Sequence, residues 1–280
     1  MIVRSFSDLI THAKSLPRPP SVVLVCADDE HSLGALTRLE RDGVLTFLLA
    51  GTSADPQAAL AEAVEHINAG RADAIMKGSL TTSTFLRAVL KSENNLRGNS
   101  LLSAVGLYEM PSYHKIFAVT DFAMNTTPDL AVKRSIIENA VALLHKLGIA
   151  EPRVAVLSEA EHVNPKIQAS IDAAELKRLN EVGEINGCII EGPISIDLAM
   201  NREAVEIKGY KSPVAADADL LVMPDVVSGN LFVKSLTMFG GAVTAGTIPG
   251  AKIPVIMTSR SSTEDDKYYS IALAAIAALK

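Results

Sequence analysis

The stretch from Thr258 to Asp266, TSRSSTEDD, places hydroxyl groups, one arginine and three carboxylates within nine residues. It follows the apolar run of residues 253–257 and leads into a helical pattern, so it begins where a strand is expected to end. A hydroxyl beside an arginine is suited to an oxyanion, because the guanidinium donates two parallel N–H bonds. Acids at a helix start are also favoured by the helix dipole, so a plain helix start explains part of the pattern. The arginine at the strand end favours an anion site beside an acid.

A second polar stretch, MKGSLTTSTFLRAVL, joins an expected strand to an expected helix. Lys77, Gly78 and Ser79 would there bring a cation, free N–H groups and a hydroxyl together, which is the chemistry of an anion site. The spacing of a Walker A loop is absent. Arg87 lies two turns into the expected helix, where it either serves that site or faces solvent.

Two further stretches follow expected strands of the chain's second half. Asp121 and Asn125 either bind a ligand or cap and turn the chain before the next helix. Ser228, Gly229 and Asn230 stand at an expected helix start, where small residues let the backbone approach a ligand. Because ligands collect beyond the carboxyl ends of parallel strands, all of these stretches are candidates for substrate binding.

Apolar runs alternate with helical patterns almost throughout the 280 residues. This order predicts an α/β protein with a mostly parallel sheet and helices on both faces. Thr127 is the expected N-cap of a long helix that has Pro128 in its first position. Residues 100–121 instead read as two strands around a turn, an antiparallel hairpin that would open a second domain. The strand candidates are residues 21–26, 44–51, 73–78, 153–158, 187–192, 218–223 and 253–257.

Composition and charge exclude several classes of function. The net charge of −6 argues against a nucleic-acid-binding protein, which needs a basic face. The amino terminus lacks a signal-peptide core, and the apolar run of residues 271–279 is too short to cross a bilayer, so we expect a cytoplasmic protein. The six His show no metal-ligand spacing and no metal site is expected, while Cys26 and Cys188 sit in apolar runs as buried thiols.

Five blocks, taken together and in order, resemble the phosphate acetyl/butyryltransferase family. They extend from about Arg71 to the carboxy terminus, and the MKG, YHK and TSR forms are closest to the phosphate butyryltransferase branch. The blocks are MKGSLTTSTFLRAVL, YHKIFAVTDFAMNTTPDL, GCIIEGPISIDLA, SPVAADADLLVMPDVVSGNLFVKSL and GAKIPVIMTSR.

The resemblance implies reversible transfer of a short acyl group, butyryl or similar, between coenzyme A and inorganic phosphate. It implies direct thiol attack on an acyl phosphate, with coenzyme A as a substrate and no permanently bound cofactor. In the family pattern Ser259 and Arg260 line the active site, Asp266 is the proposed base, and Arg87 binds substrate. Butyryl-branch members often carry a hydroxyl at the position of Asp266, so the acid in this chain leaves the acyl length open.

The resemblance also implies a two-domain fold of the isocitrate/isopropylmalate dehydrogenase type with the active site in the cleft. We expect residues 1–100 and 247–280 to form domain one, and residues 101–246 to form domain two, with the hairpin at its start. A homodimer or larger homo-oligomer is expected, without nucleic-acid or membrane partners. Three alternatives remain: acetyl specificity, a non-catalytic module that senses acyl-coenzyme A, and a dehydrogenase, which the lack of further metal-ligand carboxylates disfavours.

Overall fold

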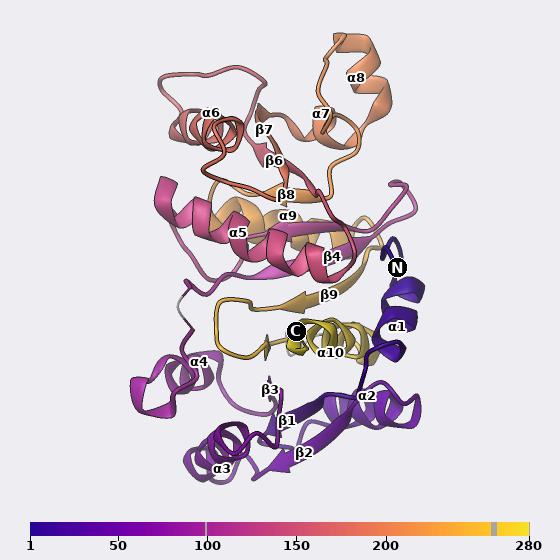
Figure 1. Ribbon diagram of the computed structural model, residues 1–280, viewed down its shortest axis with the longest axis vertical. Helices are drawn as coiled ribbons and strands as arrows, with labels where there is room; N and C mark the ends of the chain where they lie inside the picture. Colours follow the sequence, from indigo (N-terminus) through magenta and orange to yellow (C-terminus); the bar gives the residue numbers. More distant parts are fainter. Residues whose placement is uncertain (99, 259–261, 280) are drawn as a thin grey trace. The chain divides into compact units, whose positions relative to one another are not determined.

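The computed structural model describes residues 1–98, 100–258 and 262–279, and the chain divides into two compact units (Figure 1). Unit 1 comprises Met1, Val3–Leu102 and Thr244–Lys280. Unit 2 comprises Ile2 and Ser103–Val243. Unit 1 is therefore built from both ends of the chain, and its carboxy-terminal part must pair with strands formed much earlier in the sequence.

The sheet of unit 1 has four strands in the order β10-β3-β1-β2. Every pair of neighbours is parallel, as the alternation of apolar and helical segments predicts. Parallel strands covered on both faces need apolar side chains on both sides, and all four residues of β3 are buried. The strands are β1 (Ser21–Val25), β2 (Thr46–Ala50), β3 (Ala74–Lys77) and β10 (Val255–Ile256).

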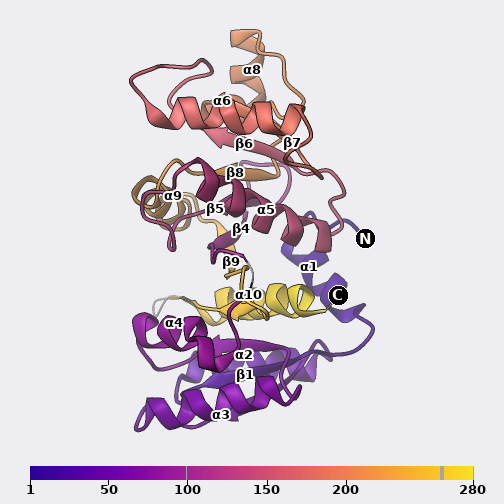
Figure 2. The same ribbon diagram turned by 60° about the vertical axis from the view of Figure 1, so that its left-hand side comes forward.

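The helices of unit 1 cover both faces of this sheet. In Figure 2, α3 lies on one side of β1 while α2 and α10 lie on the other. Right-handed crossovers produce this arrangement, because the connections through α2 and α3 run in opposite directions along the sheet. The helices are α1 (Phe6–Lys14), α2 (Glu30–Arg41), α3 (Pro56–Asn68), α4 (Thr82–Leu90), the 3₁₀ turn η1 (Ser92–Asn94) and α10 (Glu264–Ala278).

Helix α10 is the buried helix of unit 1. It packs against α1, α2, β10 and β3, and the side chains from Ile271 to Ile276 are at most 2% exposed. A helix that is apolar on all sides belongs in a protein interior, which accounts for the apolar run in the sequence. Among the described residues no helix combines the length and the apolar character that a membrane span requires.

The sheet of unit 2 is mixed, with the strand order β7-β6-β8-β5-β4-β9. β4 and β5 pair antiparallel, whereas β5–β8, β8–β6 and β6–β7 are parallel. The strand β9 contains the boundary at which the chain returns to unit 1. The strands are β4 (Val105–Glu109), β5 (Phe117–Thr120), β6 (Arg153–Leu157), β7 (Ile189–Ile194), β8 (Leu220–Val222) and β9 (Val243–Thr247).

Helices α5 and α9 lie on opposite faces of the unit 2 sheet (Figures 1 and 2). The predicted start of α5 is wrong by two residues: Asp129, not Thr127, is the N-cap, and its carboxylate accepts a hydrogen bond from the Val132 N–H at 2.9 Å. The helices are α5 (Leu130–Lys146), α6 (Gln168–Glu181), α7 (Ile196–Met200), α8 (Arg202–Lys208) and α9 (Val226–Met238).

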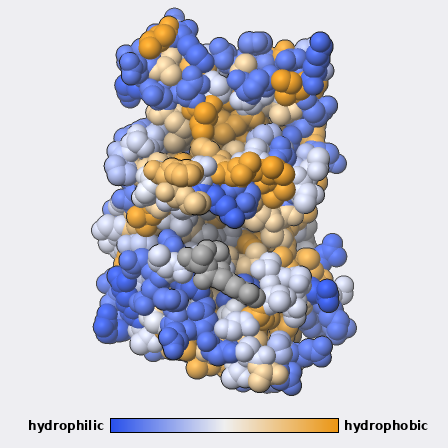
Figure 3. Space-filling model, turned by 180° about the vertical axis from the view of Figure 1, so that it is seen from behind, coloured by the Kyte–Doolittle hydropathy of each residue, from blue (hydrophilic) through white to orange (hydrophobic). Residues whose placement is uncertain are grey.

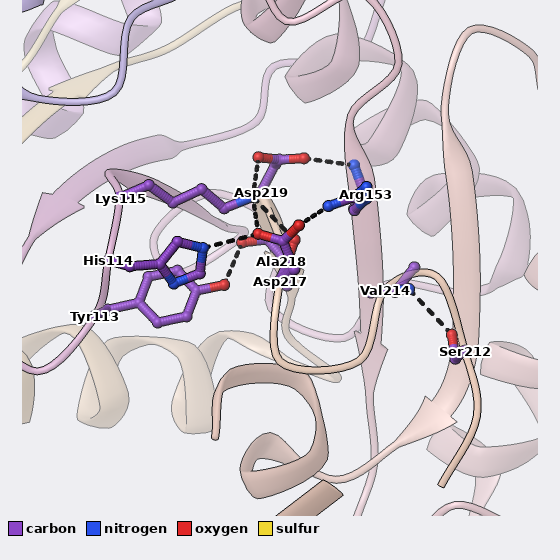
Figure 4. A network of polar contacts seen from close by, with 9 residues as sticks. All are labelled: Tyr113, His114, Lys115, Arg153, Ser212, Val214, Asp217, Ala218 and Asp219. Atoms are coloured by element: carbon purple, nitrogen blue, oxygen red, sulfur yellow. Dashed lines mark hydrogen bonds and ion pairs between the residues drawn. The ribbon is translucent and has the colours of Figure 1, made fainter. Parts of the chain in front are cut away.

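A polar network fastens the β4–β5 turn to the amino ends of β6 and β8 (Figure 4). Lys115 Nζ lies 2.6 Å from Asp219 Oδ1 and 2.8 Å from Asp217 Oδ1. Asp217 also pairs with Arg153 and lies 2.9 Å from His114 Nε2. The second Asp219 oxygen accepts the Arg153 backbone N–H at 2.8 Å. The YHK block therefore holds the amino edge of the sheet, at the opposite end of β5 from Asp121.

Replacing Lys115 by methionine is expected to destabilise the protein by about 3–5 kcal/mol, because it leaves the buried Asp219 carboxylate without its cation. The Lys115 and Asp219 side chains are only 6% and 11% exposed. Urea unfolding measures the change. Arg178→Met, which removes an exposed pair with Glu175, is the control and should cost about 0–1 kcal/mol. Equal losses of unfolding free energy in the two variants would contradict a stabilising role for the buried Lys115–Asp219 pair.

Candidate active site

Two of the four polar stretches predicted from the sequence begin at the carboxyl edge of the unit 1 sheet, where they follow β3 and β10. Ile256 of β10 stands opposite Met76 of β3, and Lys77 stands opposite Val25 of β1. Since these strands are parallel, the chain leaves all three at the same edge. The segment that begins at Thr258 thus starts beside the loop that follows Lys77. Ser259 and Arg260 themselves lie outside the described residues.

Lys77 is buried at the end of β3. The residue is only 6% exposed. Its Nζ donates to the carbonyl oxygens of Gly78 at 3.1 Å and Leu80 at 3.2 Å. Buried ammonium groups need such acceptors, because an unpaired buried charge is costly. The cation therefore holds the turn between β3 and α4, and places positive charge at the sheet edge.

The expectation of free N–H groups at Gly78 and Ser79 is wrong. The Gly78 N–H donates to the Val25 carbonyl at 2.9 Å, and the Ser79 N–H donates to the Cys26 carbonyl at 3.0 Å. The Gly78 bond continues the parallel ladder, and the turn after β3 directs the next N–H group, that of Ser79, to Cys26 as well. A Cβ at position 78 would clash with these same carbonyl oxygens, so the glycine serves the close approach of two backbones.

Helix α4 begins three residues after Ser79. Thr81 is its N-cap, and Thr81 Oγ1 accepts the Thr84 N–H at 3.2 Å. Arg87 lies in the last turn and is exposed. Within the part of the chain that the structure describes, no carboxylate forms an ion pair with Arg87. Its guanidinium is therefore suited to an anionic ligand.

Asp266 closes the first turn of α10 in a capping box with Thr263. The Thr263 N–H donates to Asp266 Oδ2 at 2.9 Å, and the Asp266 N–H donates to Thr263 Oγ1 at 3.1 Å. The neighbouring Asp265 pairs with Arg38 at 2.7 Å, and the Arg38 guanidinium lies 4.1 Å from the centre of the Tyr268 ring. Asp265 and Asp266 thus have separate surroundings, and the helix cap sets the direction of the Asp266 carboxylate.

A buried ionic group beside Asp266 escaped the sequence analysis. Lys267 is 3% exposed, and its Nζ lies 2.6 Å from Asp29 Oδ2 and 3.0 Å from Ser32 Oγ. Burial alone would raise the pKa of Asp29, but hydrogen bonds from Lys267 and Ser32 and the Lys267 charge hold that pKa below its ordinary value. The sequence offered one signal for this pair: Asp28 and Asp29 stand just after the strand candidate of residues 21–26, and so at the carboxyl edge of the unit 1 sheet.

In unit 2, Asp121 organises the loop that follows β5. The residue is 2% exposed, and its Oδ1 accepts the N–H groups of Ala123 at 2.9 Å and Met124 at 3.0 Å. Its Oδ2 accepts the Asn125 backbone N–H at 3.1 Å and the Asn125 side-chain amide at 2.6 Å. Of the two interpretations of this pair, these contacts are those of the residue that caps and turns the chain.

The start of α9 lies against that loop. A Cβ on Gly229 would come within 2.6 Å of the Asp121 carbonyl oxygen, so glycine is required for the close approach. Asn230 Nδ2 donates to the Phe122 carbonyl at 3.3 Å. Ser228 Oγ instead donates to the Asp225 carbonyl at 3.0 Å within its own turn. The structure therefore brings two predicted stretches of unit 2 together through backbone packing.

Neither cysteine has the character of a nucleophile. Both are buried free thiols, as predicted. Burial raises the pKa of Cys26, Asp28 and Asp55 raise it further, and Lys77 lowers it in part. Burial, with nearby carboxylates, raises the pKa of Cys188 to about 11. Both thiols are therefore protonated at neutral pH. The described residues contain no group of three His, Cys, Asp or Glu side chains placed to hold a metal ion.

Residues 56–275 match the model of the family described as phosphate acetyl/butaryl transferase, so the chain belongs to this family. It is 33% identical to the phosphate butyryltransferase of Clostridium acetobutylicum, over 99% of both chains. It is 37% identical to the phosphate acetyltransferase of Rhizobium meliloti, over 93% of this chain and 90% of the relative. A branched-chain phosphotransacylase structure from Enterococcus faecalis V583 superposes with a TM-score of 0.83 at 33% identity, covering 92% of this chain and 99% of that one.

The family and the enzyme class predicted from the five sequence blocks are thereby confirmed, and the chain is a phosphate acyltransferase. The predicted α/β class is confirmed by the sheets and helices of both units and by the fold of the solved relative. Relatives with acetyl and with butyryl names have similar identities to this chain, so overall identity does not select the acyl group.

Gly229→Ala tests the packing of α9 on the Asp121 loop. We expect a loss of about 1–3 kcal/mol in the free energy of unfolding, because the new Cβ meets backbone that cannot rotate away. The helical Gly34 is the matched control, since its Cβ would meet only the end of the Glu264 side chain at 2.9 Å. Gly34→Ala should be neutral or gain up to about 1 kcal/mol. A neutral Gly229→Ala would contradict the close approach.

Proposed function

We propose that the chain catalyses reversible transfer of a short acyl group, butyryl or similar, between coenzyme A and inorganic phosphate. The observation that carries the proposal is the parallel pairing of β10 with β3. Because of this pairing, the chain leaves β10 at the sheet edge where Lys77 ends β3, and the described chain resumes before the helix turn that Asp266 closes. Cationic groups and an acid would then lie at one sheet edge. Acyl transfer between a thiol and phosphate needs both, the cations to bind phosphate and the acid to accept the thiol proton.

In this proposal phosphate, or the phosphate of an acyl phosphate, binds Arg260, with Arg87 adding positive charge. A guanidinium suits this ligand because its planar fork donates two parallel bonds to phosphate oxygens. The buried ammonium of Lys77 favours an anion at the same edge without a direct bond being required. In unit 2, Asp121 and Asn125 shape the loop against which Gly229 and Asn230 pack, and Ser228 opens α9; we propose that these residues shape a substrate-binding surface.

The thiol of coenzyme A attacks the acyl carbonyl directly, and phosphate leaves with the bonding electrons. A thiol has a pKa of about 8.5 and an ordinary aspartic acid about 3.9, so complete proton transfer before attack would cost about 6 kcal/mol. Asp266 therefore takes the proton as the sulfur–carbon bond forms, when the thiol has become more acidic. Ser259 or a backbone N–H stabilises the tetrahedral oxyanion.

A panel of acyl-coenzyme A substrates tests the reaction and its acyl group together. Purified protein with phosphate and acetyl-, propionyl-, butyryl- or isobutyryl-coenzyme A should release free thiol, with the highest kcat/KM for a four-carbon acyl group. The named functions of the Clostridium acetobutylicum and Enterococcus faecalis relatives motivate this order. A preference for acetyl would contradict the acyl assignment alone. Binding of coenzyme A without thiol release would contradict the transfer reaction.

Asp266→Asn tests the base. Turnover should fall by about 10²-fold or more with little change in the Michaelis constants, because the amide cannot accept the thiol proton. Thr263→Ala removes the hydroxyl half of the capping box and leaves the carboxylate, so it separates loss of the cap from loss of the base. If Asp266→Asn lost no more activity than Thr263→Ala, the carboxylate would be a cap only.

We further propose that the chain forms a homodimer through the exposed face of α9. Val227, Leu231 and Met238 are 65%, 64% and 73% exposed, and their spacing places them on one stripe of the helix. Phe239, just beyond the helix, is 85% exposed, and Lys234 lies within the stripe. Figure 3 shows apolar side chains gathered on this side of unit 2, a pattern that marks protein contact surfaces.

Leu231→Asp combined with Met238→Asp should convert the dimer to a monomer, because two buried carboxylates on each side would oppose association. Size-exclusion chromatography with light scattering measures the mass. Ile207→Asp on α8 is the control, since Ile207 is also an exposed apolar residue, at 78%, outside the proposed face. A monomeric parent protein, or a dimer that survives the double substitution, would contradict this interface.

A further inference from the structure

The first turn of α10 is attached to α2 by a buried group that we call the Lys267 anchor, made of Lys267, Asp29 and Ser32. Lys267 Nζ lies 2.6 Å from Asp29 Oδ2 and 3.0 Å from Ser32 Oγ, and Ser32 Oγ donates to the same Asp29 oxygen at 2.5 Å. Lys267 is 3% exposed, Ser32 is fully buried, and the Asp29 side chain is 22% exposed. Asp29 is also the N-cap residue of α2, so the anchor joins the starting points of two helices.

The anchor acts on the residue next to Asp266. Successive residues of an α-helix are related by 100° of rotation and 1.5 Å of rise, so a bond that fixes Lys267 fixes the direction of its neighbour. The capping box with Thr263 orients Asp266 relative to α10, but it moves with the helix. Only contacts to another element can fix the turn relative to the sheet edge.

The other polar contacts between these helices are weaker candidates for this role. Arg38 and Asp265 are 39% and 66% exposed in their side chains, and exposed pairs hold their geometry poorly. Tyr268 donates to Asp42 at 2.8 Å, but this bond lies at the far end of α2. Among the described residues the Lys267 anchor is thus the ion pair with a buried cation that lies directly after the first turn of α10.

We infer that the Lys267 anchor is a positioning group for the Asp266 carboxylate in acyl transfer. The inference rests on the proposed function, in which Asp266 takes the thiol proton. A base acts only within hydrogen-bond reach of the proton, and a shift of about 1 Å can cost up to about 10²-fold in rate. The anchor touches neither substrate nor proton; it holds the turn that presents the base.

Lys267→Met tests the inference, because it keeps most of the length of the side chain and removes its charge. We expect kcat to fall about 10-fold or more, with the KM values for coenzyme A and phosphate changed less than twofold. Lys133→Met is the matched control: Lys133 Nζ lies 2.7 Å from Asp172, and the two side chains are 5% and 9% exposed. It should lower the melting temperature comparably and leave kcat within twofold.

A double substitution separates positioning from general loss of structure. If Lys267 acts through Asp266, adding Lys267→Met to Asp266→Asn should lower kcat by less than twofold beyond Asp266→Asn alone. Effects that multiply would overturn the inference. Should Lys267→Met fail to fold, Ser32→Ala supplies the same test, since it removes one bond from the anchor and should lower kcat about threefold, again only when Asp266 is present.

The outcomes distinguish this inference from the proposed function. A strong effect of Asp266→Asn together with unchanged kcat in Lys267→Met, or in Ser32→Ala, overturns the anchor and leaves the base in place. An unchanged kcat in Asp266→Asn removes both the base and its positioning group. Absence of thiol release by the parent protein overturns the acyl-transfer proposal itself.

Discussion

The parallel pairing of β10 with β3 is the constraint on which the candidate site depends. The two strands are separated by the whole of unit 2 in the sequence, yet Ile256 stands opposite Met76. Closing so long a loop costs conformational entropy, and a two-residue strand such as β10 cannot offset that cost by itself. The buried helix α10 supplies the stabilisation, because its apolar side chains fill the space beside β10, β3, α1 and α2.

The hydrogen-bond ladder of the same sheet decides which groups remain for a ligand. The N–H groups of Gly78 and Ser79 already donate to the carbonyl oxygens of Val25 and Cys26. Lys77 is likewise held by carbonyl oxygens of its own loop. In the proposed function, anion binding at this edge therefore depends on exposed guanidinium groups, and Arg87 is one of these among the described residues. Asp265 and Asp266, which are neighbours in α10, have separate partners in Arg38 and Thr263.

Unit 2 shows how similar side chains serve opposite ends of one sheet. At the amino ends, Asp219 accepts a backbone N–H of β6 and pairs with Lys115. At the carboxyl end of β5, Asp121 accepts hydrogen bonds from four N–H groups of its own loop. Both carboxylates are buried and satisfied by hydrogen bonds, so each rigidifies a turn.

The sequence alone determined the α/β class, the family and the positions of the main strands, because apolar periodicity and ordered local motifs are properties of short segments. It also predicted that Asp121 could turn the chain and that both cysteines are buried. It did not determine that the N–H groups of Gly78 and Ser79 donate to the carbonyl oxygens of Val25 and Cys26. Nor did it determine that Gly229 packs against the Asp121 loop. It missed the pairing of Lys267 with Asp29 altogether. These are contacts between segments far apart in the chain, and only tertiary packing brings such groups within hydrogen-bond distance.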